Sequence, residues 1–454
     1  MAIRSTICAF ALCAFASVPA WAQSPPNLPA LKGLAPVSAL AATEAGKAAL
    51  AANFTVTGGI QTGVIRQPTL LPFAAQQQQA LRDVFITDGD LAELSDGLGT
   101  TLGSAYLARA HYTDRTHFSN LTRSVADVIA YANAITETDA RAGKYFFANG
   151  TTDGKTPVSA DQAAIFKEIG GTPDIFGKAY NRPAGSPDAD AFGNSRPFQT
   201  EPEQARVAGP DYFATPADNI VYNRGPLMNL VNSPSYPSGH TTYGYMGSIV
   251  LAVLVPERYE QMVTRGAEYG NDRIIVGAHY AMDVLGGRTL ALYDLAHLLA
   301  NDPAFMGRSL KDAPVLKDFR AAVRQARSDI VKTLEAGCGQ SIAACAAEDT
   351  GRFSDAGANT AFYASTQTYG LPVVHDKTRS GTEDVAKLAP EAGYLLTVAF
   401  PNLSLQQADE ILTRTEGPGG GFLDNGSGFG VYSRLDLQAA SLQAAALHTA
   451  HKSP

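Results

Sequence analysis

The stretch Ser235-Tyr-Pro-Ser-Gly-His-Thr241 leads directly into a run, from His240 to Leu254, that is apolar almost all round. A helix that is apolar on every side lies buried in the centre of a protein. Ser and Gly in a turn aim backbone N–H groups at one point, and the helix N-terminus adds partial positive charge. Pro237-Ser-Gly-His240 therefore predicts an anion site, with His240 placed to donate a proton. The same residues are equally compatible with a simple helix cap, in which Ser238 caps and His240 lies on the surface.

A second segment, Arg273-Ile-Ile-Val-Gly-Ala-His-Tyr-Ala-Met-Asp283, carries a histidine and a carboxylate four residues apart. On a helix, His279 and Asp283 would share one face and could form a hydrogen bond. A carboxylate on one imidazole nitrogen leaves the lone pair of the other nitrogen free as a nucleophile or ligand. Arg273 offers a planar fork of donors that suits phosphate. Taken alone, the segment is also compatible with an ordinary His–Asp pair on the surface.

The remaining pattern is mostly α-helical. Apolar residues recur at helical spacing in four further segments, which are Val125–Ile135, Ala160–Ile169, Tyr280–Leu299 and Leu405–Arg414. Pro256 suits the first position of a helix that runs towards Gly270, and Asn301-Asp-Pro303 ends the helix that begins near Tyr280. Strand signals are scarce before residue 370, so we expect a mostly α fold.

Four regions of the chain differ in composition and residue pattern. Residues 1–22 have the pattern of a signal peptide, residues 23–74 that of an N-terminal arm, and residues 75–334 that of a helical domain. Residues 335–454 are rich in Gly, Ser and Thr and form a C-terminal extension of mixed character whose role is open. A lid over the site and an oligomer contact are both compatible with it.

Composition excludes several classes of partner. The 454 residues include 35 Lys and Arg against 43 Asp and Glu, with no basic block, so a nucleic-acid face is not expected. No apolar run approaches the roughly 20 residues that a membrane helix needs, so integral membrane association is not expected. A small ligand, and possible homo-oligomerisation, remain open.

The N-terminus predicts export. Arg4 supplies the positive start, Ile7–Val18 the apolar stretch and Ala20-Trp-Ala22 the small-residue cleavage site. Cleavage after Ala22 would leave Gln23 at the new N-terminus and place the protein in the periplasm or the medium.

Removal of the signal peptide would leave two of the four cysteines, Cys338 and Cys345. In an oxidising compartment a local disulfide between them is the natural interpretation, and two buried thiols are the alternative. No further cysteine lies nearby, so a metal site there is not expected.

The segments at 235–241 and 273–283, in this order and spacing, resemble those of the bacterial class A non-specific acid phosphatases. These enzymes belong to the superfamily of type 2 phosphatidic acid phosphatases and vanadium haloperoxidases. The signature of that superfamily is K-x6-R-P, then P-S-G-H, then S-R-x5-H-x3-D. P-S-G-H is complete at 237–240 and R-x5-H-x3-D is complete at 273–283. The flanks at 265–270 and 301–305 are also similar, and the resemblance covers roughly residues 75–330. It implies a helical bundle like that of the acid phosphatases and haloperoxidases.

Two positions depart from the signature. Asp272 stands where the family has Ser, which removes one phosphate hydrogen bond and adds an acid near an anion. The first motif is broken, because Arg196-Pro197 fits R-P but the nearest upstream lysine, Lys178, lies too far away unless a loop is inserted. Arg182-Pro183 competes as the R-P element.

The resemblance implies a mechanism for the matching positions. Lys178, Arg196 and Arg273, with backbone N–H groups around Ser238 and Gly239, would hold the phosphoryl oxygens. His279, oriented by Asp283, would attack phosphorus to form a phosphohistidine. His240 would protonate the leaving alcohol, which gives the highest activity at mildly acid pH. These cationic side chains would stabilise the negative charge of the phosphoryl group. The hydrolysis of a small phosphorylated substrate is therefore expected to need neither a metal nor a cofactor.

Two alternatives use the same pocket. A vanadate-dependent haloperoxidase would hold vanadate there, although the lack of tryptophan after residue 22 and the phosphatase-like flanks favour the phosphatase. A phosphate-binding protein without turnover would result if Asp272 and the broken first motif disabled catalysis.

Overall fold

The computed structural model describes residues 23–450 with several gaps. The gaps are residues 66–70, 85, 87–90, 111, 115–116, 119–121, 152–154, 172–173, 185, 187–191 and 201–232. The predicted signal peptide, residues 1–22, lies outside the described residues, as do residues 451–454.

The N-terminal arm is helical and packs into the body. Its elements are α1 (Leu28–Leu34), η1 (Ala35–Ala42), α2 (Glu44–Thr62) and the start of α3 (Phe73–Asp83). Thr43 caps α2 by accepting a hydrogen bond from the N–H of Gly46, and Gly63 ends it in the left-handed conformation. On the buried side of α2, Asn53 and Thr57 accept hydrogen bonds from the first backbone N–H groups of a later helix, α11.

The next elements surround the centre of the molecule. They are η2 (Leu91–Leu98), α4 (Thr100–Leu107), the strands β1 (Tyr112–Asp114) and β2 (His117–Phe118), α5 (Arg123–Asn149), α6 (Ala160–Glu168), α7 (Ile175–Ala179) and α8 (Pro197–Thr200). The two short strands pair with each other in antiparallel orientation. The predicted helix at 125–135 is the first half of α5, which is longer because its buried face continues to Ala148.

The core is built on α9, which packs against α5, α10 and α11. The central elements are α9 (Gly239–Leu254), η4 (Pro256–Arg258), α10 (Tyr259–Ile275), α11 (Ala281–Ala300) and α12 (Phe319–Cys338). At Gly244 a Cβ atom would clash with the ring of Tyr269, so α9 and α10 approach too closely there for a larger residue. Asn301 ends α11 in the left-handed conformation, as the Asn-Asp-Pro sequence predicts.

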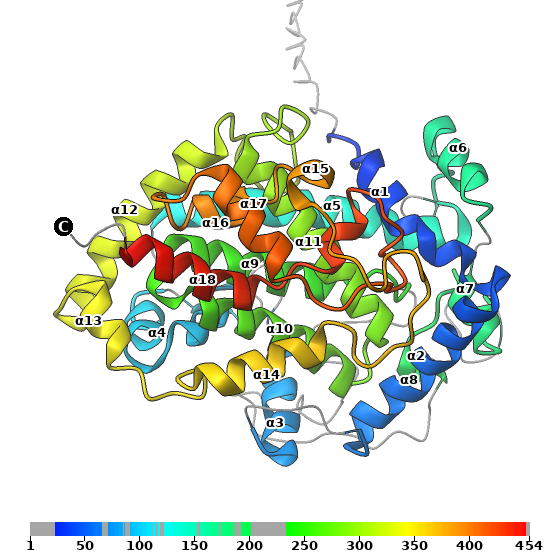
Figure 1. The fold of residues 1–454 in the computed structure, drawn as a ribbon, viewed down its shortest axis with the longest axis horizontal. Coiled ribbons are helices and arrows are strands. Elements are labelled where there is room, and N and C mark those ends of the chain that lie inside the picture. The colour runs from blue at the N-terminus through cyan, green and yellow to red at the C-terminus, as the bar shows by residue number, and fades with distance from the viewer. Residues whose placement is uncertain are drawn as a thin grey trace, which may run out of the picture.

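The described part of the C-terminal extension consists of helices and loops that pack on this core. Its elements are α13 (Ile342–Ala347), α14 (Ala356–Thr366), α15 (Val385–Leu388), α16 (Tyr394–Thr397), α17 (Leu405–Arg414), η5 (Gly430–Ser433) and α18 (Leu437–Ala450). The helices α14 and α18 pack against α10, and α16 and η5 pack against α11, although they come late in the chain (Figure 1). The prediction of a mostly α fold is confirmed.

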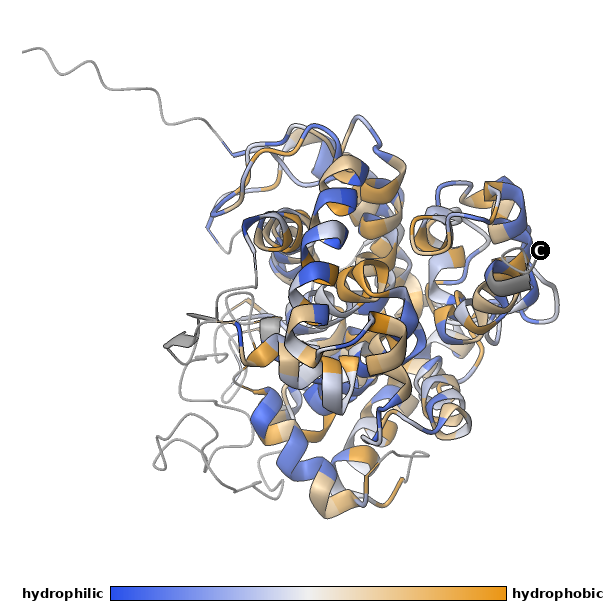
Figure 2. Cartoon of the chain, turned by 90° about the vertical axis from the view of Figure 1, so that its left-hand side faces the viewer, coloured by the Kyte–Doolittle hydropathy of each residue, from blue (hydrophilic) through white to orange (hydrophobic). Residues whose placement is uncertain are grey.

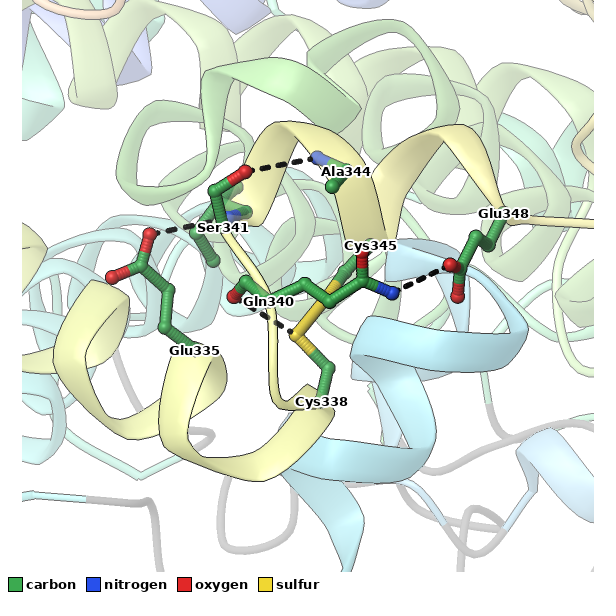
Figure 3. The surroundings of a disulfide bond; sticks show 8 residues. Glu335, Cys338, Gln340, Ser341, Ala344, Cys345 and Glu348 are labelled. Atoms are coloured by element: carbon green, nitrogen blue, oxygen red, sulfur yellow. Dashed lines mark hydrogen bonds between the residues drawn. A yellow bond between two sulfur atoms is a disulfide. The ribbon is translucent and has the colours of Figure 1, made fainter.

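The predicted disulfide is present. Cys338, at the end of α12, is bonded to Cys345 in α13 (Figure 3). Ser341 caps α13 through the N–H of Ala344, and Glu335 accepts from the N–H of Ile342. The short loop between the two helices is therefore held by a covalent bond and by capping hydrogen bonds.

Helices at the surface carry both hydrophilic and hydrophobic residues, as expected of helices that bury one face (Figure 2). Within the described part of the chain, no helix combines the length and the apolar character needed to cross a bilayer.

Candidate active site

The N-terminus of α9 is capped by Ser238. Its Oγ accepts a hydrogen bond from the N–H of Thr241 at 3.1 Å, and its own N–H donates to the carbonyl oxygen of Asp283 at 3.0 Å. The helix-cap interpretation is therefore correct for Ser238. His240, in the first turn, is partly exposed and its ring centre lies 6.3 Å from that of His279. The cap thus brings the two motif histidines together.

His279 lies just before α11, not on it, so the expectation that it shares a helix with Asp283 is wrong. The chain leaves α10 through a turn in which Gly277 has a φ of 72°, and the N–H of His279 donates to the carbonyl oxygen of Arg273 at 3.1 Å. Tyr280 is the extended N-cap residue of α11, and Asp283 Oδ2 accepts from its N–H at 2.8 Å. The two side chains meet because a capping interaction, rather than helical spacing, orients Asp283.

The imidazole of His279 is fully buried and has a partner on each nitrogen. Arg196 Nη1 lies 3.0 Å from Nε2, and Ser235 Oγ lies 3.2 Å from Nδ1. Asp283 Oδ2 is 3.5 Å from Nδ1 and also forms a short hydrogen bond with Ser235 Oγ. Ser235 is thus the nearer partner of Nδ1, a role that the sequence motif did not indicate.

Arg196 is held by backbone carbonyl groups. Its Nε donates to Ser233 O at 2.7 Å, and its Nη1 donates to Ala278 O at 2.9 Å as well as to His279. This buried guanidinium therefore joins the loop before α9 to the loop before α11, which supports the assignment of Arg196 to the R-P element.

Arg273 is buried without a hydrogen-bond partner. Its side chain has no exposed surface, and within the described residues none of its three guanidinium nitrogens meets an acceptor. The guanidinium lies 4.7 Å from the ring centre of Tyr269. A buried cation without a hydrogen bond is costly, so this arrangement favours the binding of an anion.

A lysine reaches the site from an unexpected helix. Lys144, on α5, donates from Nζ to Pro234 O at 2.8 Å, and its Cε would lie 3.4 Å from a Cβ atom on Gly239. The candidate chosen from sequence, Lys178, is exposed on α7 and its charge acts on Asp174. The structure does not bring Lys178 to the site. Lys144 was missed because its spacing to Arg196 does not match the motif.

Burial and positive charge lower the pKa of both histidines. Burial, followed by Arg273 and Arg196, holds the pKa of His240 well below its ordinary value. Burial, followed by Arg196 and Lys144, does the same for the pKa of His279. A neutral imidazole can act as a nucleophile, and Arg196 can donate only to an unprotonated Nε2.

The carboxylate of Asp283 is also buried. Burial raises its pKa to about 6, against the hydrogen bonds from Ser235 and the N–H of Tyr280, which lower it. Asp283 is therefore ionised at neutral pH and takes up a proton in mild acid.

Asp272 belongs to a different environment. Burial, followed by the carboxylates Asp83 and Glu268, holds its pKa well above the ordinary value, and it shares a hydrogen bond with Asp83. Both effects favour its protonated form. The acid that was expected next to a bound anion lies instead within a separate polar cluster.

Comparison with known proteins finds similarity to one family in the region of these residues. Residues 187–301 match the family model described as the PAP2 superfamily. Over 89 residues the chain is 42% identical to the non-specific acid phosphatase of Salmonella typhimurium (strain LT2), which covers 20% of this chain and 35% of that protein. It is 42% identical over 64 residues to the acid phosphatase of Zymomonas mobilis, covering 14% and 24% of the two chains. It is 39% identical over 72 residues to the non-specific acid phosphatase of Providencia stuartii, covering 16% and 29%. The matched stretches span about a third or less of the length of these relatives.

Proposed function

We propose, from the match of residues 187–301 to the PAP2 superfamily model, that the protein is an acid phosphatase that hydrolyses phosphate monoesters. The single observation that carries the proposal is the buried guanidinium of Arg273, which has no described hydrogen-bond partner and lies close enough to influence both motif histidines. A dianionic phosphoryl group would supply the acceptors that this cation lacks.

The surroundings of the phosphoryl group would be cationic on several sides. Arg273, Arg196 and Lys144 would contact its non-bridging oxygens, and Lys144 takes the place that the motif had assigned to Lys178. The N–H groups of Gly239 and His240 belong to the first turn of α9, where no intrahelical carbonyl is available to them. Fixed donors of this kind stabilise the charge of the transferring phosphoryl group, which is usually the largest contribution to such catalysis.

The chemistry would proceed in two displacements. His279 Nε2 attacks phosphorus while the ester oxygen leaves and takes a proton from His240, which gives a phosphohistidine and an alcohol. Neutral His240 then accepts a proton from water as the water oxygen attacks phosphorus. The P–N bond breaks, phosphate leaves, and His279 is neutral again. We propose no metal in either step, because the side-chain cations and α9 carry the charge stabilisation.

We also propose that the protein acts outside the cytoplasm. The pattern at residues 1–22 is that of a cleaved signal peptide, and a disulfide such as Cys338–Cys345 persists in oxidising compartments. Mass spectrometry of the exported protein is expected to give Gln23 as the N-terminal residue, and an intact Met1 would contradict export by cleavage.

The test of function is hydrolysis of p-nitrophenyl phosphate at mildly acid pH in the presence of EDTA. Wild-type protein is expected to turn over, and His279→Ala to lose all but background activity. The control is His448→Ala near the end of α18, a histidine that belongs to neither motif and is expected to keep wild-type activity.

Three outcomes would overturn the proposal. Loss of activity with EDTA that returns with a divalent cation would show a metal-dependent enzyme. No hydrolysis by wild-type protein, together with oxidation of bromide by peroxide and vanadate, would replace the phosphatase with a haloperoxidase. Tight binding of inorganic phosphate with neither activity would indicate the phosphate-binding alternative.

A further inference from the structure

Ser235 lies between the nucleophile candidate and its carboxylate. All three side chains, Ser235, His279 and Asp283, are fully buried. The Oγ of Ser235 is 3.2 Å from His279 Nδ1 and forms a short hydrogen bond with Asp283 Oδ2. The direct distance from Nδ1 to Asp283 Oδ2 is 3.5 Å, beyond the usual range for an N–H···O hydrogen bond.

The positions of the protons on His279 and Ser235 follow from which neighbouring groups can only donate hydrogen bonds. Arg196 is a donor at every nitrogen, so its contact with His279 Nε2 requires a lone pair on Nε2. The single proton of the neutral ring is then on Nδ1, and Ser235 Oγ is its nearest acceptor. The hydroxyl keeps one proton of its own, which can be donated only to the carboxylate at Asp283 Oδ2.

The backbone holds Ser235 in this position from the other side. Its N–H donates to Asn194 O at 2.8 Å, two residues before Arg196. The side chain of Asn194 donates in turn to the carbonyl oxygen of Tyr236 at 3.2 Å. The groups that contact the two nitrogens of His279 therefore belong to segments that are hydrogen-bonded to each other.

We infer that Ser235 is a positioning residue: its hydroxyl links His279 Nδ1–H to the Asp283 carboxylate and so keeps the lone pair of Nε2 directed at the phosphoryl group. This inference rests on the proposed function. It changes the expected His–Asp pair into a His–Ser–Asp relay, in which the carboxylate acts on the imidazole through the serine hydroxyl.

The first test observes the tautomer of His279 directly, without turnover. Protein labelled with ¹⁵N-histidine is compared with His279→Ala to assign the ring signals of His279. Wild-type protein is expected to carry the proton on Nδ1, and Ser235→Ala to show a mixture of tautomers or a proton on Nε2. A wild-type ring protonated on Nε2 overturns the relay without recourse to any variant.

The second test measures p-nitrophenyl phosphate hydrolysis in a double-mutant cycle. Ser235→Ala is expected to lower kcat by about 10–100-fold, as is typical when a partner that orients a catalytic histidine is removed, with little change in KM. Because the two residues act in series, adding Ser235→Ala to Asp283→Asn is expected to cause no further loss. Ser235→Thr, which retains a hydroxyl, is expected to recover part of the activity.

A matched control removes another buried hydroxyl. Ser248, on α9, is fully buried and its Oγ has no partner among the described residues, so Ser248→Ala is expected to leave both the tautomer and kcat unchanged. Wild-type kcat and tautomer in Ser235→Ala would overturn the relay, as would fully additive losses in the cycle. Wild-type turnover that is lost in His279→Ala would still support the proposed function, so the two proposals can fail separately.

Discussion

Lys144 and Lys178 show what a linear motif can and cannot specify about a single residue. The motif requires a lysine near the R-P element, and Lys178 is the nearest one upstream of Arg196 in the sequence. In the fold, the last turns of α5 place Lys144 against the loop before α9 instead. Arg273, His240 and Asp283 were predicted as site residues because their segments carry complete motifs.

The two lysines give a direct comparison by mutation. Lys144→Met is expected to lower kcat for p-nitrophenyl phosphate by about 10²–10³-fold, the usual effect of removing one donor to a developing charge. Lys178→Met removes the same charge from an exposed position and is expected to have near wild-type kinetics. Steady-state kinetics of both variants check this, and a larger effect at Lys178 would contradict the site described above.

The pH dependence follows from His240. Burial and the cations around it hold its pKa well below the ordinary value, so the proton of the general acid is lost as pH rises. A phosphate dianion in the pocket offsets those cations and is expected to raise this pKa. In an NMR titration, inorganic phosphate should therefore shift the midpoint of His240 upward, and kcat should fall as pH rises above neutral.

Two results would contradict this role of His240. One is a midpoint that stays the same or falls when phosphate binds. The other is a kcat that stays constant from acid to alkaline pH. A fall in kcat below about pH 6 is also expected, because Asp283 with a pKa of about 6 then takes up a proton.

At the scale of elements, the contact between α10, α3 and η2 is made by buried charges. Arg265 donates to Asp83 Oδ2 at 2.7 Å and to Asp96 Oδ1 at 2.7 Å. Arg352, from the C-terminal extension, also pairs with Asp96 at 3.0 Å. These ion pairs form the polar cluster that encloses Asp272, so the departure from the family serine is accommodated by the packing of α10.

Arg265→Met is expected to destabilise the protein by about 3–5 kcal/mol, because it leaves buried carboxylates without their main partner. Arg123→Met breaks an ion pair with Asp127 in which the arginine side chain is 87% exposed. This substitution is expected to lower the free energy of unfolding by less than about 1 kcal/mol. Denaturant unfolding monitored by circular dichroism measures both. Equal effects of the two substitutions would show that the buried cluster adds nothing to stability.

Element boundaries were predictable where local signals are strong. The expected helices at 240–254 and 405–414 agree with α9 and α17 to within a residue, since a cap and an apolar pattern mark both of them. The position of His279 outside α11 was not predictable from its spacing to Asp283. The extended Tyr280 and the buried capping contacts from α2 set that boundary, and both depend on tertiary structure.

On the scale of the whole molecule, the C-terminal extension contributes to the core that supports the site. Tyr259 in α10 donates to Leu395 O at 2.8 Å, and Arg288 in α11 donates to Leu435 O at 2.9 Å. Both α10 and α11 lead directly into the loop that carries His279. Sequence composition left the role of this extension open, because contacts that form only between distant segments leave no local pattern in the sequence.

A chain that ends at residue 334 is therefore expected to lose cooperative unfolding, since it would expose the buried faces of α10 and α11. Thermal unfolding followed by calorimetry checks this directly. A truncated protein that remains folded and gains activity on large phosphate esters would show instead that the extension is a removable lid.

The proposed mechanism depends on a phosphohistidine at residue 279, and trapping this intermediate tests the mechanism most directly. Wild-type protein turning over p-nitrophenyl phosphate is quenched in alkali, where phosphohistidine survives, then digested and analysed by mass spectrometry. A phosphoryl group is expected on the peptide that contains His279, and none is expected in His279→Ala. Turnover with a phosphoryl group on another residue, or with none on the enzyme under conditions that preserve phosphohistidine, would contradict it.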